Sequence, residues 1–348
     1  MASGENHAFG AFMMKICVVG AGAIGGFMAA RLAGSGHELS VIARGAHLQA
    51  MRTHGLRLIA EDGSASTHDV AATDRTAGLP PQDVVILGMK AHQVPAVAAD
   101  VPGLLGAHTV VVTAQNGLPW WYFHKCGGPH EGRGLESVDP GGVIARHIPA
   151  ERVIGCVVYP ACEIVEPGLV RQIEGNRFPL GELDGSDTPR LRALVDAFRA
   201  AGFKSPVLTD IRAEIWLKLW GNLSFNPISA LTHATLADIC GHEPTRQLAR
   251  TMMLEAQAIA EKLGIRFKVD VDRRIAGAQA VGQHKTSMLQ DVEAGRALEL
   301  PALVQSVIEM GRITDTPTPT ISHVHALATL LAQTLQARHG RLRIEPQG

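Results

Sequence analysis

The sequence is poor in cysteine, and neither sign of charge is in excess. Its five cysteines among 348 residues form no Cys-x-x-Cys pair and cannot all be bridged, which favours a reducing compartment. We therefore expect a cytoplasmic protein. Lys and Arg number 32 against 33 Asp and Glu, so the net charge of −1 predicts neither nucleic acid nor an anionic membrane as a partner.

Neither long apolar runs nor the features of a signal peptide are found. The apolar runs at 84–89 and 110–112 are far shorter than the roughly 20 residues of a membrane helix, so we expect no membrane span. The first dozen residues contain Glu5, no basic residue and no apolar core, which is unlike a signal peptide. We expect residues 1–14 to form a disordered leader.

The length and the order of patterns predict two domains. From residue 15, short apolar runs alternate with helical patterns, which implies a parallel sheet covered on both faces. Beyond about residue 210, helical periodicity dominates. The expected strands cover 15–19, 38–43, 83–89, 108–114, 153–158, 169–173 and 206–209, the expected helices 24–32, 46–53, 92–105 and 188–201, and the expected hairpin 56–60 and 66–71.

The first expected strand is followed by a glycine-rich turn, Gly20-Ala21-Gly22-Ala23-Ile24-Gly25, in the strand–turn–helix context that G-x-G-x-x-G requires. Gly20 allows the tight turn, Gly22 lets a pyrophosphate approach the backbone, and Gly25 allows close helix–strand packing. The start of the helix offers unpaired N–H groups. We expect a dinucleotide to bind at Gly20, Gly22, Ala23, Ile24 and Gly25. The alternative is a glycine turn inside an ordinary α/β core.

The end of the second expected strand indicates which dinucleotide binds. NAD sites usually place Asp or Glu there for the ribose 2′-hydroxyl, whereas this chain has Arg44 and no acidic residue. A guanidinium can hold the 2′-phosphate of NADP through charge-assisted hydrogen bonds. We therefore expect NADP(H). The alternative for Arg44 is a solvated arginine in a loop.

These patterns predict a mixed α/β chain of two parts. We expect a Rossmann-type NADP-binding domain over 15–209 and an all-helical substrate or catalytic domain over 210–348. The block 119–148 is rich in Gly and Pro and is long for a loop in a compact domain. Loops of that size are usually functional or disordered.

A polar series runs through the otherwise apolar segment 216–227. Lys218, Asn222 and Asn226 are four residues apart and therefore lie along one face of a helix. Asn is a poor helix former, so two of them among Trp, Leu and Phe indicate polar groups kept for a cleft. The alternative is a solvated stripe on an amphipathic helix. We expect Pro227 to end or kink this helix, with Asn226 at its frayed end.

A third segment, 285–300, contains a serine and a carboxylate twelve residues apart. We expect Ser287 to cap a helix, because Ser-x-x-Gln is a capping box, and Gly295 to end it. Glu299 lies between two leucines, where an unpaired carboxylate is costly unless it meets a cation. Lys218 is the candidate for that cation.

Together these motifs resemble the ketopantoate reductase family, within the wider 6-phosphogluconate-dehydrogenase-like group. The glycine turn, Arg44, the Lys218 series and the serine–glutamate pair occur in that family's order and spacing. Lys90, which closes Val-Ile-Leu-Gly-Met-Lys, and Gln115-Asn116-Gly117 also match. The similarity covers about residues 15–335.

The resemblance implies NADPH-dependent reduction of an α-keto acid, 2-dehydropantoate to pantoate, in pantothenate and coenzyme A biosynthesis. As the family implies, Lys218 polarises the C2 carbonyl and donates the proton while NADPH delivers hydride, and Glu299 lies near that lysine and the substrate hydroxyl. An ammonium suits this role because it stabilises the alkoxide that forms in the transition state. The family's substrate-binding positions match Asn116, Asn222, Asn226 and Ser287, and its cofactor-side positions match Lys90 and Asn116.

Two features depart from the family's pattern. Pro301 stands where the family often has Asp; we expect it to be the first residue of the next helix and to alter capping more than chemistry. Four aromatic residues in a row follow Asn116 closely: Trp120, Trp121, Tyr122 and Phe123. They either pack against the helical domain or a subunit, or line the cleft and favour a substrate bulkier than 2-dehydropantoate.

The sequence leaves other functions open. One alternative is a related oxidoreductase for a bulkier 2-keto or 2-hydroxy acid. Another is a non-catalytic NADP-binding sensor. The presence of both Lys218 and Glu299 counts against a sensor, because dinucleotide binding requires neither. The segment 124–130 has the ligand types of a zinc site at a spacing that matches no common one, so we expect no metal. The expected partner is a small α-keto acid. The sequence leaves open whether the protein also forms a homodimer.

Overall fold

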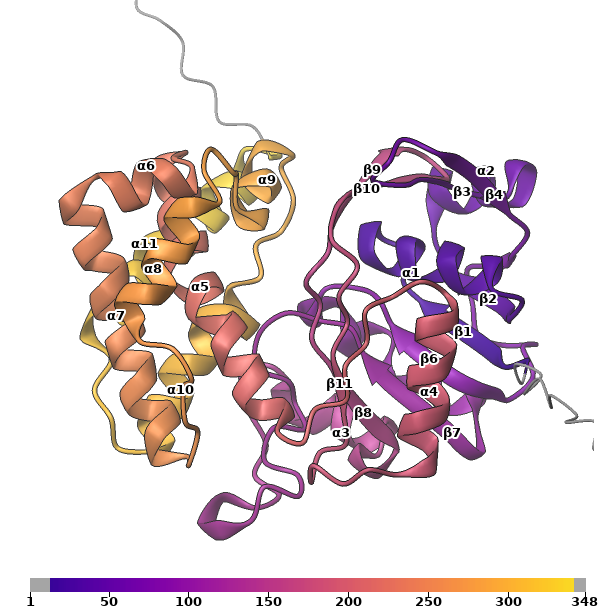
Figure 1. Cartoon of the computed structure of the whole chain (residues 1–348), viewed down its shortest axis with the longest axis horizontal. Coiled ribbons are helices and arrows are strands. Elements are labelled where there is room, and N and C mark those ends of the chain that lie inside the picture. The colour runs from indigo at the N-terminus through magenta and orange to yellow at the C-terminus, as the bar shows by residue number, and fades with distance from the viewer. Residues whose placement is uncertain (1–12, 341–348) are drawn as a thin grey trace, which may run out of the picture. The chain divides into compact units, whose positions relative to one another are not determined.

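The computed structural model describes residues 13–340, so the expected leader lies outside the described residues except for its last two. The chain divides into two compact units, whose course Figure 1 shows. The first comprises the residues up to Met89, Val97–Ala114 and His147–Thr209, and the second comprises Lys90–Ala96, Gln115–Arg146 and the residues from Asp210 on. The sequence predicts 90–96 and 115–146 to be part of the first domain. They belong to the second unit because they pack with its helices.

The first unit is built on a seven-stranded sheet in the order β11-β8-β7-β6-β1-β2-β5. Its pairs are parallel except β11 with β8. In register, Val18 lies opposite Val41 and Ile86, so the carboxyl ends of three central strands meet at one edge. The strands are β1 (Lys15–Val19), β2 (Glu38–Ile42), β5 (Ala71–Thr73), β6 (Gln82–Leu87), β7 (Leu105–Thr113), β8 (Val153–Cys156) and β11 (Leu180–Gly181).

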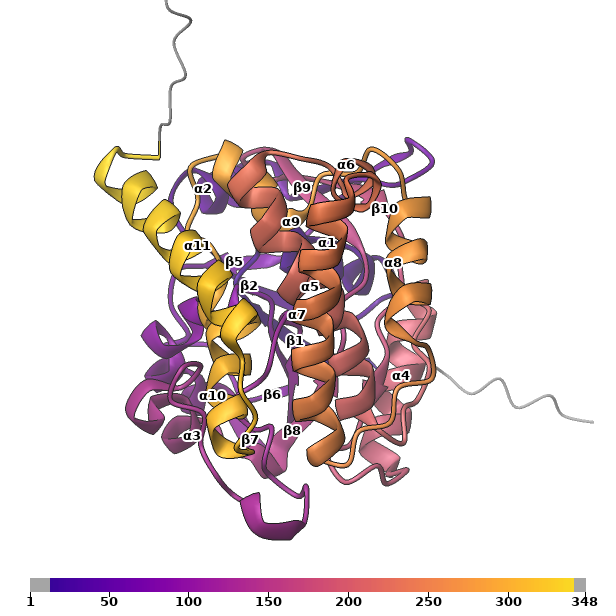
Figure 2. The same cartoon turned by 90° about the vertical axis from the view of Figure 1, so that its left-hand side faces the viewer.

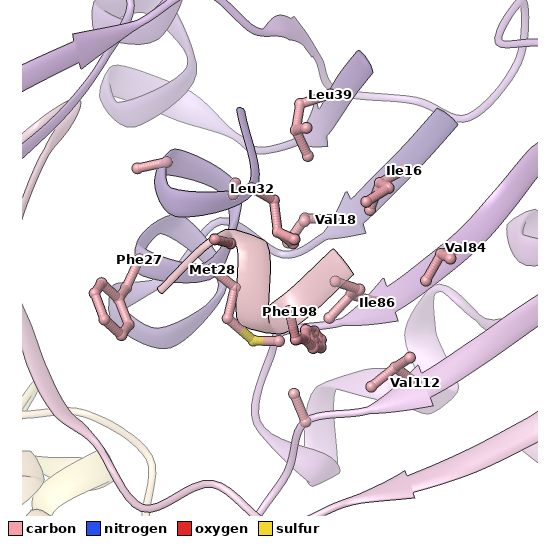
Figure 3. Close-up of a cluster of buried hydrophobic side chains, with 14 of the residues drawn as sticks. Ile16, Val18, Phe27, Met28, Leu32, Leu39, Val84, Ile86, Val112 and Phe198 are labelled. Carbon is pink, nitrogen blue, oxygen red and sulfur yellow. The ribbon is translucent and has the colours of Figure 1, made fainter. Parts of the chain in front are cut away.

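Two helices, α1 (Ala23–Gly34) and α4 (Pro189–Ala200), share a hydrophobic core with this sheet. Figure 3 shows Met28 and Leu32 of α1 and Phe198 of α4 among the strand side chains Ile16, Val18, Val84, Ile86 and Val112. Another helix, α2 (Gly45–His54), follows β2. The expected helices 24–32, 46–53 and 188–201 are thus confirmed to within two residues at each end.

A smaller sheet with the order β4-β3-β10-β9 completes the first unit. Its strands are β3 (Leu56–Ile59), β4 (Ala65–His68), β9 (Ala161–Glu166) and β10 (Leu169–Glu174). The expected hairpin is confirmed as the antiparallel pair β3–β4. Strand β9 is not predicted from the sequence, because this edge strand has two glutamates, exposes its last three residues and lacks clear alternation.

Two predicted elements are wrong. The expected helix 92–105 is a pair of 3₁₀ helices, η1 (Ala91–Ala96) and η2 (Ala98–Leu104). Each contains a proline, Pro95 or Pro102, that cannot donate the N–H bond of an α-helix. The expected strand 206–209 does not form; a single bridge joins Leu180 to Val207 there.

The second unit is helical, and its longest helix, α5 (Ile211–Thr232), contacts α7, α9 and α11 (Figure 2). Contrary to our expectation, α5 continues through Pro227, and Asn226 is buried rather than frayed, because tertiary packing around α5 outweighs one missing N–H bond. No helix within residues 13–340 is long and apolar enough to cross a membrane. The helices that follow α5 in the chain are α6 (Leu236–Gly241), α7 (Glu243–Lys262), α8 (Val271–Ala280), α9 (Ser287–Glu293), the π-helical turn η6 (Pro301–Gln305), α10 (Ser306–Ile313) and α11 (Pro319–Ala337).

Candidate functional site

The turn between β1 and α1 has the backbone that a dinucleotide requires. Gly20 has a left-handed φ of +94°, and a Cβ on Gly25 would lie 2.1 Å from the carbonyl oxygen of Gly20. A Cβ on Gly22 would meet no atom within 4 Å, so the turn leaves open space at the N-cap of α1. No side chain caps α1, and the N–H groups at Ala23 and Ile24 start the helix without an intrahelical partner. These features suit a pyrophosphate.

Arg44 lies at the same edge of the sheet as this turn. The carbonyl oxygen of Ile42, the last residue of β2, accepts hydrogen bonds from the backbone N–H groups of Gly20 and Ala21 at 3.0 and 3.2 Å. Arg44 follows two residues later as the N-cap of α2, with an exposed side chain. The first unit therefore holds Gly20, Gly22, Ala23, Ile24, Gly25 and Arg44 around the start of two neighbouring helices.

His47, for which the sequence predicts no role, also contacts the glycine turn. Its Nδ1 accepts a hydrogen bond from the backbone N–H of Gly168 at 2.8 Å, and its Nε2 lies 2.7 Å from the carbonyl oxygen of Ala21. These contacts fit a neutral ring with the proton on Nε2. Burial lowers the pKa of His47, while the bond to Ala21 opposes that shift. No sequence signal identifies this residue, because its partners come from distant segments.

The second unit brings together the lysine and asparagine predicted from the sequence. The Lys218 ammonium on α5 donates a hydrogen bond to the side-chain oxygen of Asn116 at 2.5 Å. Gly117, beside that asparagine, has a φ of +89°, and a Cβ there would lie 2.3 Å from the carbonyl oxygen of Ala302. The segment that carries Asn116 therefore packs closely on the turn that follows Glu299.

The other predicted polar residues lie on α5 and α9. Asn226 is 5% exposed, and its side-chain amide donates to the Ser287 hydroxyl at 3.5 Å, a long hydrogen bond. Asn222 is half-buried, midway between Lys218 and Asn226 on the same helix. One expectation is wrong here: Thr286, not Ser287, caps α9, because its hydroxyl accepts from the N–H of Leu289. Ser287 is the first helical residue.

Glu299 is 7% exposed, so its carboxyl group is largely removed from water. Burial raises its pKa, with a smaller raising effect from Asp291, while Lys90, Lys218 and the N–H of Ala91 lower it. We expected Lys218 alone to be the compensating cation. Both Lys90 and Lys218 lower the pKa of Glu299, and Lys90 lowers it more than Lys218 does.

Lys90 is held by Asp291, a residue that the sequence analysis did not single out. The Lys90 ammonium is paired with the Asp291 carboxylate, which is 4% exposed and also accepts from Arg296 at 2.8 Å. No sequence signal identifies Asp291, because its burial and its pairing with Lys90 arise only in the folded chain. Lys90, Asn116, Lys218, Asn222, Asn226, Ser287 and Glu299 thus all belong to the second unit.

The four aromatic residues at 120–123 are all buried, none more than 5% exposed. The Tyr122 hydroxyl accepts a hydrogen bond from the indole N–H of Trp216 on α5 at 2.7 Å. Arg212 donates to the backbone carbonyl oxygens of Tyr122 and His124. These contacts support packing on the helices of the second unit, the first of our two alternatives.

The rest of the 119–148 block forms short helical turns, namely η3 (Gly128–His130), η4 (Pro140–Gly142) and α3 (Val143–His147). His130 lies with its ring centroid 5.6 Å from that of Phe123. Within the described part of the chain, no three His, Cys, Asp or Glu side chains are grouped so that they could hold a metal ion.

Comparison with known proteins finds family matches in both the N-terminal and the C-terminal part of the chain. The family model for the ketopantoate reductase PanE/ApbA matches residues 16–120, and the model for the C-terminal part of the same enzymes matches residues 210–332. The first match covers the glycine turn, Arg44, Lys90 and Asn116, and the second covers Lys218 and Glu299.

Individual relatives match over nearly the whole chain. A 2-dehydropantoate 2-reductase of Mesorhizobium japonicum is 58% identical over 92% of this chain and 98% of its own length. A crystal structure assigned to the ketopantoate reductases, from Ralstonia solanacearum MolK2, is 44% identical with a TM-score of 0.89, covering 93% of this chain and 99% of its own. A 2-dehydropantoate 2-reductase of Geobacter metallireducens GS-15 has 28% identity and a TM-score of 0.78, with 90% and 99% covered. With this identity and coverage, and with family models matched in both halves, the chain belongs to the ketopantoate reductase family.

Proposed function

We propose that the protein is an NADPH-dependent reductase that converts 2-dehydropantoate to pantoate, a step of pantothenate and coenzyme A biosynthesis. The observation that carries this proposal is the Lys218 ammonium, which Asn116 holds in the unit that also contains the buried Glu299. The relative from Mesorhizobium japonicum, named for this reaction, supports the choice of substrate.

NADPH is the proposed cofactor because of the glycine turn and of Arg44, which follows β2. The open space at Gly22 and the uncapped start of α1 suit a pyrophosphate, and the exposed guanidinium of Arg44 suits the 2′-phosphate that distinguishes NADP from NAD. In the second unit, Lys90 and Asn116 are the proposed cofactor-side groups. When bound, NADPH supplies the hydride for C2 of the keto acid.

Lys218 is the proposed catalytic residue. Its ammonium polarises the C2 carbonyl, stabilises the negative charge that develops on the oxygen, and donates the proton that completes the alcohol. The hydrogen bond to Asn116 orients the ammonium.

Glu299 is the proposed partner of Lys218 and of the substrate hydroxyl. Because burial raises its pKa, the carboxyl group keeps its proton to a higher pH than an exposed glutamate and can act as a hydrogen-bond donor as well as an acceptor. Asn116, Asn222, Asn226 and Ser287 are the proposed substrate-binding groups.

The first alternative, a substrate bulkier than 2-dehydropantoate, rested on the aromatic block as a pocket lining. These four residues are buried, and Tyr122 is hydrogen-bonded to Trp216 of helix α5, so no observation favours that alternative. A cytoplasmic location and a homodimer also remain proposals.

The test of this function is a turnover screen. The purified protein is mixed with NADPH and a panel of 2-keto acids of increasing size, and loss of nicotinamide absorbance is followed. We expect kcat/KM to be highest for 2-dehydropantoate. A higher value for a bulkier acid would refute the substrate, and binding of NADPH without turnover of any acid would favour the sensor.

A further inference from the structure

The helix that follows Glu299 begins with a π-helical turn, η6. The backbone N–H of Ser306 donates to the carbonyl oxygen of Pro301, five residues earlier, instead of to Ala302, four residues earlier. One turn upstream, Leu303 donates to Glu299 with the ordinary spacing of four. π-Helical turns are rare and frequently occur at functional sites.

The turn releases the carbonyl group of Ala302 from the helix. That oxygen accepts instead from the backbone N–H of Leu118 at 2.9 Å and from the Ser306 hydroxyl at 2.7 Å. Ser306 is fully buried and Ala302 is 2% exposed, so both bonds lie away from water. Buried polar groups rarely lack partners, so these two bonds hold the Ala302 carbonyl group in place; we call this group with its two donors the Ala302 anchor.

The Ala302 anchor lies beside Asn116, the residue that holds the proposed catalytic Lys218. Leu118 follows Asn116 and Gly117, and Gly117 packs so closely on Ala302 that only glycine fits. Asn116 in turn accepts the hydrogen bond of Lys218. A continuous chain of contacts therefore runs from Ser306, through Ala302 and the Asn116 segment, to Lys218. Glu299 stands at the start of the same turn.

We propose that Ser306 is a positioning residue, which, through the carbonyl group of Ala302 in the π-helical turn, sets the place of Asn116 and so of Lys218 relative to Glu299. This inference rests on the proposed function of Lys218. Without the hydroxyl, Ala302 keeps one hydrogen bond instead of two, and the helix can return to the ordinary spacing by taking the Ala302 oxygen back from Leu118.

The test compares Ser306→Ala with a matched control, Ser224→Ala. Ser224 is also fully buried, and its hydroxyl also bonds to the carbonyl oxygen four residues earlier, that of Trp220, at 2.7 Å. The two substitutions remove the same group from the same kind of site. Each variant is assayed for kcat with 2-dehydropantoate across pH, for NADPH affinity by fluorescence, and for thermal stability.

We expect Ser306→Ala to lower kcat about three- to tenfold, the scale of one lost hydrogen bond, and to move the pH profile of kcat. NADPH affinity stays unchanged, Ser306→Thr recovers activity, and Ser224→Ala keeps kcat and the profile. Equal changes in kcat for both alanine variants, in proportion to lost thermal stability, would show a merely structural role and overturn the proposal.

A second measurement does not depend on turnover. The rate at which Lys218 reacts with trinitrobenzenesulfonate, followed by peptide mass spectrometry, reports whether Asn116 still holds the ammonium. We expect this rate to rise severalfold in Ser306→Ala and not in Ser224→Ala. If the unsubstituted protein reduces no keto acid, the proposed function fails, yet this rise would still support the positioning of Lys218. An unchanged rate would contradict it.

Discussion

Glu299 is a buried carboxyl group whose position costs stability. Its pKa is raised in the folded protein from the ordinary value of 4.5. Between these two values the folded chain keeps a proton that the unfolded chain has released, so stability is lost as pH rises through this interval. Glu299→Gln should therefore raise the free energy of unfolding at pH 7–8 by about 0.5–2 kcal/mol while kcat falls. Urea titration and turnover assays measure both. A loss of stability at pH 8 would show that the carboxylate stabilises the fold.

Arg44 is the residue on which cofactor choice depends. Arg44→Ala should lower the preference for NADPH over NADH by about 10- to 150-fold, because a charge-assisted contact contributes roughly 1.5–3 kcal/mol. The ratio of kcat/KM for the two cofactors measures it. Arg52→Ala is the matched control, since Arg52 is an exposed arginine on the same helix, α2, whose side chain bonds to Ala72. Equal efficiency with both cofactors before any substitution would refute the assignment.

His47 links stability to pH. Burial lowers its pKa from the ordinary value of 6.5, so the unfolded chain binds the proton more readily, and stability is lost as pH falls from about 6.5 through the folded value. One proton accounts for at most about 1.4 kcal/mol per pH unit. His47→Gln, which can still accept from Gly168 and donate to Ala21, should flatten this dependence between pH 7 and 5. An unchanged slope in thermal melts would contradict this assignment.

At the scale of elements, one helix start depends on a side chain far away in sequence. Helix α11 has no side-chain cap from Thr318; instead, the Glu255 carboxylate on α7 accepts from the N–H groups of Thr320 and Ile321 at 2.9 and 3.0 Å. Glu255→Ala should cost about 0.5–2 kcal/mol of stability in urea titration, the range for a lost helix cap, with Glu255→Gln intermediate. No change in either variant would mean that the start of α11 needs no cap.

Strong local patterns were sufficient to predict most elements of the first unit. The strand over 15–19 is observed with the same bounds, since a buried apolar run ended by glycine has few alternatives. Predictions failed where tertiary packing or missing donors decide the outcome. Pro95 and Pro102 prevented a regular helix, whereas packing carried α5 past Pro227.

For the candidate site, the sequence predicted part of the geometry, and the roles of its residues stay predictions. The lysine and asparagine spacing on α5 follows from helix geometry, and the structure joins Lys218 to Asn116. The roles of Asp291 and Ser306 could not be predicted, because their partners, Lys90 and the Leu118–Ala302 pair, meet them only in the folded chain.

At the scale of the molecule, the glycine turn and Arg44 belong to the first unit, and Lys218 and Glu299 belong to the second. Substitution of Lys218 should therefore leave the proposed pyrophosphate and 2′-phosphate contacts of NADPH intact. Binding and chemistry can then be measured separately in one variant.

The most direct test of the account is Lys218→Ala, with the exposed Lys268→Ala as the matched control. We predict that Lys218→Ala lowers kcat for 2-dehydropantoate by at least about two orders of magnitude, the usual scale for losing a proton donor or oxyanion stabiliser, while NADPH binding is retained. Lys268→Ala should keep both. A folded Lys218→Ala protein with near-normal kcat would contradict the central claim that this lysine carries the chemistry.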